Sequence, residues 1–87
     1  MVTVRIPQPM RVYTNDKDVV RSTGQNVRKL IDELEGSYPG IKAALVTDDK
    51  LRPDVAIMLD GKISRLGLLQ PLSDENEVVF IPAISGG

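Results

Sequence analysis

The fold is decided by the stretch EVVFIPAISGG, residues 77–87, at the carboxyl end of the sequence. Four consecutive apolar residues, 78–81, stand between a polar turn and Pro82. A short apolar run bounded by turn-forming residues is typical of a strand that is buried on both faces, and therefore of a central strand. We expect residues 78–81 to form such a strand, with 83–87 leading away from it.

Length and composition limit the class of protein. Eighty-seven residues suffice for one domain. Because the sequence has one Phe and no Trp, Val, Ile and Leu must build the core. The absence of Cys and His removes disulfides, thiolate nucleophiles, imidazole bases and the usual zinc ligands.

Charge and hydropathy bear on the partners. A net charge of -1 argues against nucleic acid as a partner, since a basic face is the usual footprint. Residues 1–30 are mainly basic and the last seventeen carry only acidic charges, which fits either a mixed solvated surface or a charged rim around a binding patch. No apolar run could cross a membrane and no signal peptide is recognisable, so we expect a cytoplasmic protein.

The amino-terminal segment predicts a hairpin with a long tip. Residues 2–6 alternate apolar and polar, as expected for a half-buried strand. Pro7 and Pro9 end the strand because neither can donate a backbone hydrogen bond. Residues 10–13 could resume as the return path, and residues 19–22 form a short second strand.

The next segment has the pattern of an amphipathic helix. Asn26 is a good N-cap, and Gly36 offers a C-terminal cap before Pro39. One face of this helix is apolar and comprises Val27, Leu30, Ile31, Leu34 and Tyr38. The other face carries two predicted i,i+4 ion pairs, Arg28–Asp32 and Lys29–Glu33.

The remaining segments complete a small sheet. They predict a short helical turn at 41–46, a polar loop at 47–50, a strand at 55–59, a type I′ turn at Asp60-Gly61, a partner strand at 62–65 and a leucine-rich loop at 66–72. The order places one helix against one side of the sheet only, which defines an α+β fold. We expect a β-grasp topology: a mixed sheet of four to five strands, with the last strand beside the first at the centre. Residues 1–83 would form this domain and 84–87 a flexible tail.

No constellation of side chains predicts catalysis. The glycines are isolated apart from Gly86-Gly87, so there is no phosphate-binding loop. Asp48 and Asp49 lack the spacing of a calcium loop. Glu33 and Glu35 should lie on the exposed helix face, where solvent would keep each pKa at its ordinary value. We therefore predict no metal site and no enzyme active site.

The carboxyl terminus remains as the candidate functional group. Gly86 and Gly87 have no Cβ atoms and can pass through a channel too narrow for larger residues. The carboxylate of Gly87 would then be a reactive handle held away from the domain. The alternative is an inert end that follows a core strand.

Together these segments resemble the MoaD/ThiS ubiquitin-like sulfur carriers. Residues 72–87 are similar to the closing motif of that family: a Leu, an acidic turn, a Val-rich strand, a Pro and a terminal Gly-Gly. The first strand, the helix and the middle hairpin match as well. The segments at 3–7, 38–41 and 81–83 resemble those of the family branch that carries sulfur for cysteine synthesis. The family turn is commonly Asp-Gly-Asp; here Asn76 takes the place of Gly and should tolerate the left-handed conformation.

The resemblance implies a carrier and not an enzyme. A partner E1-like enzyme would use ATP and magnesium to adenylate Gly87, and sulfur transfer would then give a thiocarboxylate. The acceptor would be a cysteine synthase-like enzyme, the large subunit of molybdopterin synthase, or thiazole synthase. No cofactor would bind to this chain itself. The alternative is a ubiquitin-like modifier that is joined through Gly87 to lysines of target proteins.

Such a carrier needs a surface for docking. Alternation along the last strand places Val79 and Ile81 on the face opposite Val78 and Phe80. Met58, Ile81 and Pro7 could then form an exposed apolar patch beside the tail, or loops could cover them as ordinary core. The predicted partner-binding residues are Pro7, Met58, Ile81, Pro82, Ile84 and Ser85.

Overall fold

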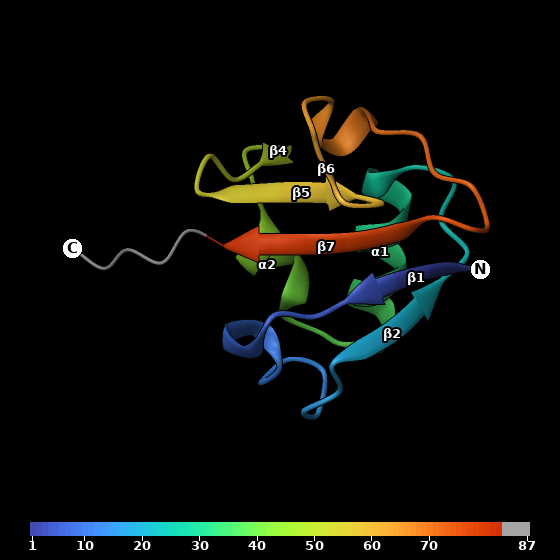
Figure 1. The fold of residues 1–87 in the computed structure, drawn as a ribbon. Helices are drawn as coiled ribbons and strands as arrows, with labels where there is room; N and C mark the ends of the chain where they lie inside the picture. Colours follow the sequence, from blue (N-terminus) through green and yellow to red (C-terminus); the bar gives the residue numbers. More distant parts are fainter. Residues whose placement is uncertain (83–87) are drawn as a thin grey trace.

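A computed structural model of the chain describes residues 1–82 and reveals a five-stranded mixed sheet with helices on one face (Figure 1). Its strands are β1 (Val2–Arg5), β2 (Val19–Ser22), β5 (Val55–Leu59), β6 (Lys62–Ser64) and β7 (Glu77–Pro82). The order is β2-β1-β7-β5-β6. Strands β1 and β7 pair in parallel and all other neighbours are antiparallel. The predicted central position of the last strand beside the first is therefore confirmed.

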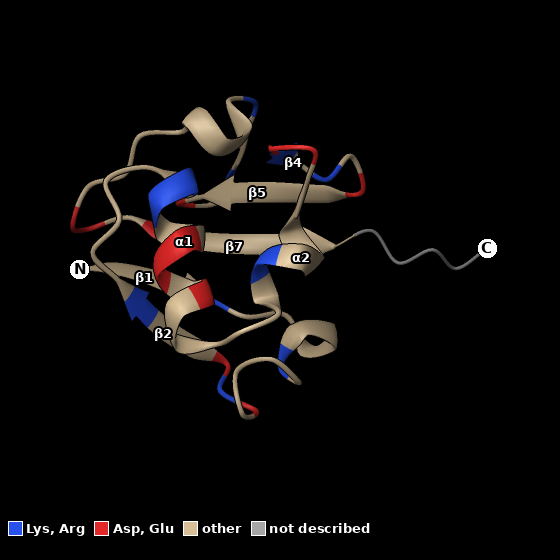
Figure 2. Cartoon of the chain, turned by 180° about the vertical axis from the view of Figure 1, so that it is seen from behind, with Lys and Arg blue, Asp and Glu red and all other residues tan. Residues whose placement is uncertain are grey.

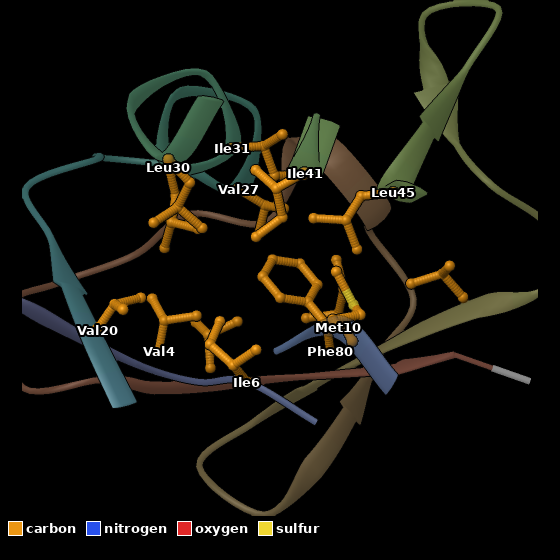
Figure 3. Close-up of a cluster of buried hydrophobic side chains, with 14 of the residues drawn as sticks. Val4, Ile6, Met10, Val20, Val27, Leu30, Ile31, Ile41, Leu45 and Phe80 are labelled. Atoms are coloured by element: carbon orange, nitrogen blue, oxygen red, sulfur yellow. The ribbon is translucent and has the colours of Figure 1, made fainter. Parts of the chain in front are cut away.

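The helices and short elements cover the sheet on the side of its core. They are α1 (Val27–Ser37), α2 (Ile41–Leu45), the 3-10 helices η1 (Gln8–Met10) and η2 (Gly67–Leu69), and a two-stranded hairpin of β3 (Val46–Thr47) and β4 (Lys50–Leu51). Phe80 of β7 is fully buried, and its ring projects from the sheet toward the side chains of α1 and α2 (Figure 3). The core is aliphatic around this single Phe, as the composition predicts.

Helix α1 follows the predicted pattern in its position and its buried face. The Asn26 side chain accepts a hydrogen bond from the Lys29 backbone N–H at 2.8 Å, which confirms the N-cap. The C-terminal cap was predicted wrongly. Gly36 lies within the helix, and the N–H of Tyr38 donates to the Leu34 carbonyl instead.

The two predicted ion pairs along α1 do not form within residues 1–82. Arg28 binds the Asp49 carboxylate at 2.8 Å, and Asp32 binds Lys42 at 2.7 Å. The Thr23 hydroxyl donates to Glu33 at 2.7 Å. Arg28, Asp32 and Glu33 thus have partners on neighbouring segments, and such tertiary contacts replace the weak pairs available on a helix surface.

Two loops are more ordered than the sequence indicates. Residues 10–13 do not form a strand; Met10 ends η1 and is buried in the core. The predicted polar loop at 47–50 closes a tight hairpin, with φ of 50° at Asp48 and 63° at Asp49. Asp tolerates the left-handed region better than most residues, so two consecutive Asp residues can form this turn.

The turn before β7 is held by side-chain hydrogen bonds. Asn76 was predicted to adopt a left-handed backbone, but its φ is not positive. Its Oδ1 accepts the Ser73 backbone N–H at 2.7 Å, and its Nδ2 donates to Asp60 Oδ2 at 2.6 Å. Asp60 Oδ1 accepts the Glu77 N–H at 2.8 Å, which ties the β5–β6 turn to the start of β7. Asn76 thus stabilises the turn through hydrogen bonds of its side-chain amide and not through its backbone conformation.

This geometry predicts that Asn76→Gly lowers the free energy of unfolding by about 1–2 kcal/mol, because the side-chain hydrogen bonds to Ser73 and Asp60 are lost and the backbone gains nothing. Asn15 is the matched control, since its φ is 54°. Asn15→Gly should be close to neutral, because glycine relieves the left-handed strain at an entropic cost. Urea denaturation of both variants measures the difference. An Asn76→Gly protein as stable as the wild type would contradict the assignment.

Candidate functional site

Strand β7 ends at one end of the sheet, and this end is the candidate functional site. Its last residue, Pro82, pairs with Val55 at the start of β5. The carboxyl end of β1 points the same way because β1 and β7 are parallel (Figure 1). The predicted residues Ile84, Ser85, Gly86 and Gly87 lie outside the described residues, as does the proposed boundary of the domain and the tail.

The outer face of the sheet, turned away from α1, carries a strip of apolar side chains. Alternation along β7 is as predicted: Val78 and Phe80 are fully buried, whereas Ile81 is 37% exposed. The expected burial of this strand on both faces is therefore wrong, because no element covers the outer side of residues 79 and 81 within the described part of the chain. Cross-strand partners share a face, so the pairs Ala56–Ile81 and Met58–Val79 both lie on the outer side. We call this surface, with Ile63, the outer apolar strip; it comprises Ala56, Met58, Ile63, Val79 and Ile81.

The predicted partner-binding residues are placed unequally. Met58 and Ile81 lie on the same face of adjacent strands, and Pro82 follows at the end of β7. Pro7 lies two residues beyond β1, where it precedes η1, and belongs to no strand. It is half-buried, and the chain that follows it, with η1, lies near the end of the sheet toward which β7 runs (Figure 1).

Ile63 belongs to this surface although it was not among the predicted partner-binding residues. Ile63 is 57% exposed and pairs with Met58 across the β5–β6 hairpin. A signal for it was available. The two-residue turn at Asp60-Gly61 fixes the register of Leu59 opposite Lys62, and so of Met58 opposite Ile63.

A shallow depression adjoins the point where β7 ends. It has a volume of about 280 Å³ and is lined by Pro53, Asp54, Val55, Ala56 and Ile81. On the other flank of the strip, Arg5 and Glu77 form an ion pair at 3.0 Å. The outer apolar strip is therefore bordered by a small hollow beside the end of β7 and by an ion pair at the start of that strand, an arrangement typical of a protein-binding surface.

Two carboxylates of α1 have lowered pKa values because they accept hydrogen bonds from neighbouring segments. The pKa of Glu35 is below its ordinary value because its carboxylate accepts the backbone N–H groups of Lys42 and Gly40. The Thr23 hydroxyl likewise lowers the pKa of Glu33. The expectation of ordinary pKa values on this helix face is wrong for both residues. Both shifts favour the charged form, whereas a general acid needs a raised pKa.

The described part of the chain offers neither a cluster of metal ligands nor a helix that could span a membrane. Within residues 1–82, no group of three or more Asp or Glu side chains is arranged so that it could hold a metal ion. The helices in that range are also too short or too polar to cross a membrane.

A mixed five-stranded sheet with parallel first and last strands and one main helix on one face is the ubiquitin-like β-grasp fold. The chain belongs to the ThiS family, which matches residues 4–87. It is 32% identical to the sulfur carrier protein CysO of Mycobacterium tuberculosis over 91 residues, covering 99% of this chain and 98% of the relative.

Two solved structures agree with this family assignment. A chain of the BexX/CysO complex of Amycolatopsis orientalis superposes with a TM-score of 0.94 at 32% identity, covering all of both chains. CysO of Mycobacterium tuberculosis superposes with a TM-score of 0.89 at 30% identity, over 97% of this chain and 100% of that one. The predicted family and the predicted branch are therefore both supported by relatives that extend over nearly the whole chain.

The bond between Glu35 and the α1–α2 connection predicts a pH dependence. A lowered folded pKa contributes stability above the unfolded value, and this contribution is lost as the pH falls from the ordinary value of 4.5 through the folded pKa. Glu35→Gln should reduce stability at neutral pH, and the difference from the wild type should shrink as the pH falls through this range. Thermal melts at a series of pH values test this, with Glu75→Gln on an exposed turn as the charge-matched control. A constant difference between Glu35→Gln and the wild type across the acid range would contradict it.

Proposed function

We propose that the protein is a sulfur carrier whose functional group is the carboxylate of Gly87. The observation that carries the proposal is the family match, which extends to Gly87 and includes relatives named as sulfur carriers at 32% identity over 99% of the chain. The fold is consistent with this role, because the central strand β7 leads directly to the segment that carries the group.

The chemistry requires activation, since a carboxylate does not react with sulfide. An E1-like partner enzyme binds ATP and magnesium, and an oxygen of the Gly87 carboxylate attacks the α-phosphorus and displaces pyrophosphate. Hydrosulfide then attacks the acyl carbon of the adenylate and AMP leaves, which produces the thiocarboxylate. The activated oxygen leaves with AMP, and the thiol proton passes to solvent. In this scheme the chain supplies the acyl group and the partner supplies every catalytic residue.

The outer apolar strip is the proposed docking surface for this partner. Ile81 and Met58 would contact the enzyme, with Pro7 and Pro82 at the end of the sheet. Ile84 and Ser85 would then lead Gly86 and Gly87 into the active site. Exposed apolar patches bordered by charged groups are typical of such interfaces.

The acceptor is proposed from the similarity to CysO. A cysteine synthase-like enzyme would receive the sulfur, and the two other acceptors, the large subunit of molybdopterin synthase and thiazole synthase, are the alternatives within the same chemistry. Each acceptor must bind the same terminal residues, so partner surfaces and not the tail decide which one is used.

The first test follows the terminal carboxylate. Protein purified from its native host should show the mass increase of one oxygen replaced by sulfur, and fragmentation should place it at Gly87. A chain that lacks Gly86 and Gly87 should fold normally and lose all sulfur transfer. Transfer by the truncated chain would overturn the proposal. Conjugates with lysines of other proteins, without any thiocarboxylate, would instead establish the modifier function.

The second test addresses the docking surface. Ile81→Asp places a charge in the strip beside the end of β7 and should lower kcat/KM for adenylation on the order of tenfold or more, as expected for an apolar contact that the partner buries. The effect should appear mainly in KM, because the tail itself is unchanged. Gly36→Asp is the matched control; it adds the same charge on α1, where no atom lies within 4 Å of the new Cβ. Equal rates for the two variants, measured by pyrophosphate release, would exclude the strip as the docking surface.

A further inference from the structure

A groove between η2 and the β3–β4 hairpin is separate from the proposed docking surface. Its volume is about 350 Å³. Leu68 forms part of its buried lining, whereas Leu66 is 55% exposed and Leu69 is 76% exposed. Two exposed leucines beside a hollow offer apolar area that the domain itself does not use.

The groove carries a net positive charge. Its basic lining residues are Arg28, Lys50 and Arg65, and its only acidic one is Asp49, whose carboxylate binds Arg28 at 2.8 Å. Lys50 and Arg65 form no ion pair within residues 1–82. The Arg28 guanidinium holds the pKa of Asp49 below its ordinary value, so this carboxylate remains charged and engaged with its partner. Lys50 and Arg65 are therefore the two cations of the groove that could pair with a ligand.

Both walls of the groove are fixed to α1. Arg28 also donates to the Asp49 backbone carbonyl at 3.1 Å, which holds the β3–β4 hairpin. On the other side, the Val27 N–H donates to the Gln70 carbonyl at 3.0 Å, and the Ser64 hydroxyl bonds to the Gln70 side chain at 2.6 Å. A groove built from fixed walls needs little ordering when a ligand binds.

The position of the groove leaves the end of β7 free. Its walls, η2 and β4, lie beyond the β5–β6 edge of the sheet, on the side of α1, whereas the chain leaves β7 at the end of the sheet (Figures 1 and 2). None of the residues that line the groove belongs to the outer apolar strip. A ligand in the groove would therefore not occupy the surface proposed for the activating enzyme.

We infer that this groove binds a segment of a partner protein in which acidic residues alternate with aliphatic ones. Carboxylates of the segment pair with Lys50 and Arg65, and its aliphatic side chains pack against Leu66 and Leu69. This second contact holds the domain on a partner while the residues beyond β7 enter an active site. The binding contact itself goes beyond the proposed function; its role in holding the domain while these residues enter an active site rests on that function.

The test uses a defined probe and the full chain. The probe is an acetylated, amidated peptide of sequence Asp-Leu-Glu-Leu-Asp-Leu-Glu, titrated into the ¹⁵N-labelled protein and followed by NMR. Amide shifts are expected at Leu51, Gly67 and Leu69 and not at Ile81 or Met58. Shifts confined to the outer apolar strip, or no shifts at millimolar peptide, would overturn the inference.

Two altered peptides separate the two parts of the recognition. A peptide with Asn and Gln in place of the acids, and one with Ser in place of Leu, should each bind at least about tenfold more weakly if both contacts contribute. Equal binding of the Ser peptide, or the same shifts with inorganic phosphate, would show a simple anion site and overturn the inference. Shifts at Leu66 and Leu69 that depend on protein concentration without peptide would identify a second copy as the occupant and also overturn it.

Matched variants complete the test. Leu69→Ser should weaken peptide binding, whereas Val12→Ser should not; Val12 is 77% exposed and lies outside the groove. Lys50→Glu with Arg65→Glu should weaken binding about tenfold or more, and Lys17→Glu with Arg21→Glu, near the opposite edge of the sheet, should have a much smaller effect. Equal losses of peptide affinity for Leu69→Ser and Val12→Ser, or for the two double charge reversals, would overturn the inference. Sulfur transfer assays on the same variants remain an independent measure of the proposed function.

Discussion

The parallel pairing of β1 with β7 is the constraint on which the rest of the structure depends. It places the last strand between β1 and β5, so that its backbone is hydrogen-bonded on both sides. One side chain face of β7 then has to be covered, and α1 and α2 do so around Phe80. Because a parallel pair needs a crossover connection, the chain between β1 and β7 must include the helix that forms this cover.

Periodic patterns allowed the main elements to be predicted. β7 was predicted from an unbroken apolar run, the alternation of side chains along a strand then gave its two faces, and the apolar spacing from Val27 to Leu34 gave the buried face of α1. The predictions that were wrong concern side chains whose partners are distant in sequence. Arg28 was expected to pair with Asp32, four residues away, but its partner Asp49 is brought near by the fold. Asn76 was interpreted through its backbone, whereas its role depends on Asp60 in another turn.

The candidate site, too, was predictable only where local patterns determine it. Ile81 and Met58 could be placed on one face because side chains alternate along β7 and β5, and the two-residue turn fixes the register of β5 with β6 alone. The groove beside η2 could not be predicted, since its walls come from three separate segments and no local pattern joins Arg28, Lys50 and Leu69. Only the packing of α1 against η2 and the β3–β4 hairpin brings these side chains together.

The double pairing of β7 also determines how the domain responds to mechanical load. A force applied beyond Pro82 acts along the strand, and the hydrogen bonds to β5 run across that direction. The bonds to β5 and β1 are therefore loaded together in shear and cannot open one at a time, as they would if an edge strand were peeled away. An enzyme that grips the carboxyl-terminal segment can pull against a rigid anchor, and the same geometry resists unfolding from that end.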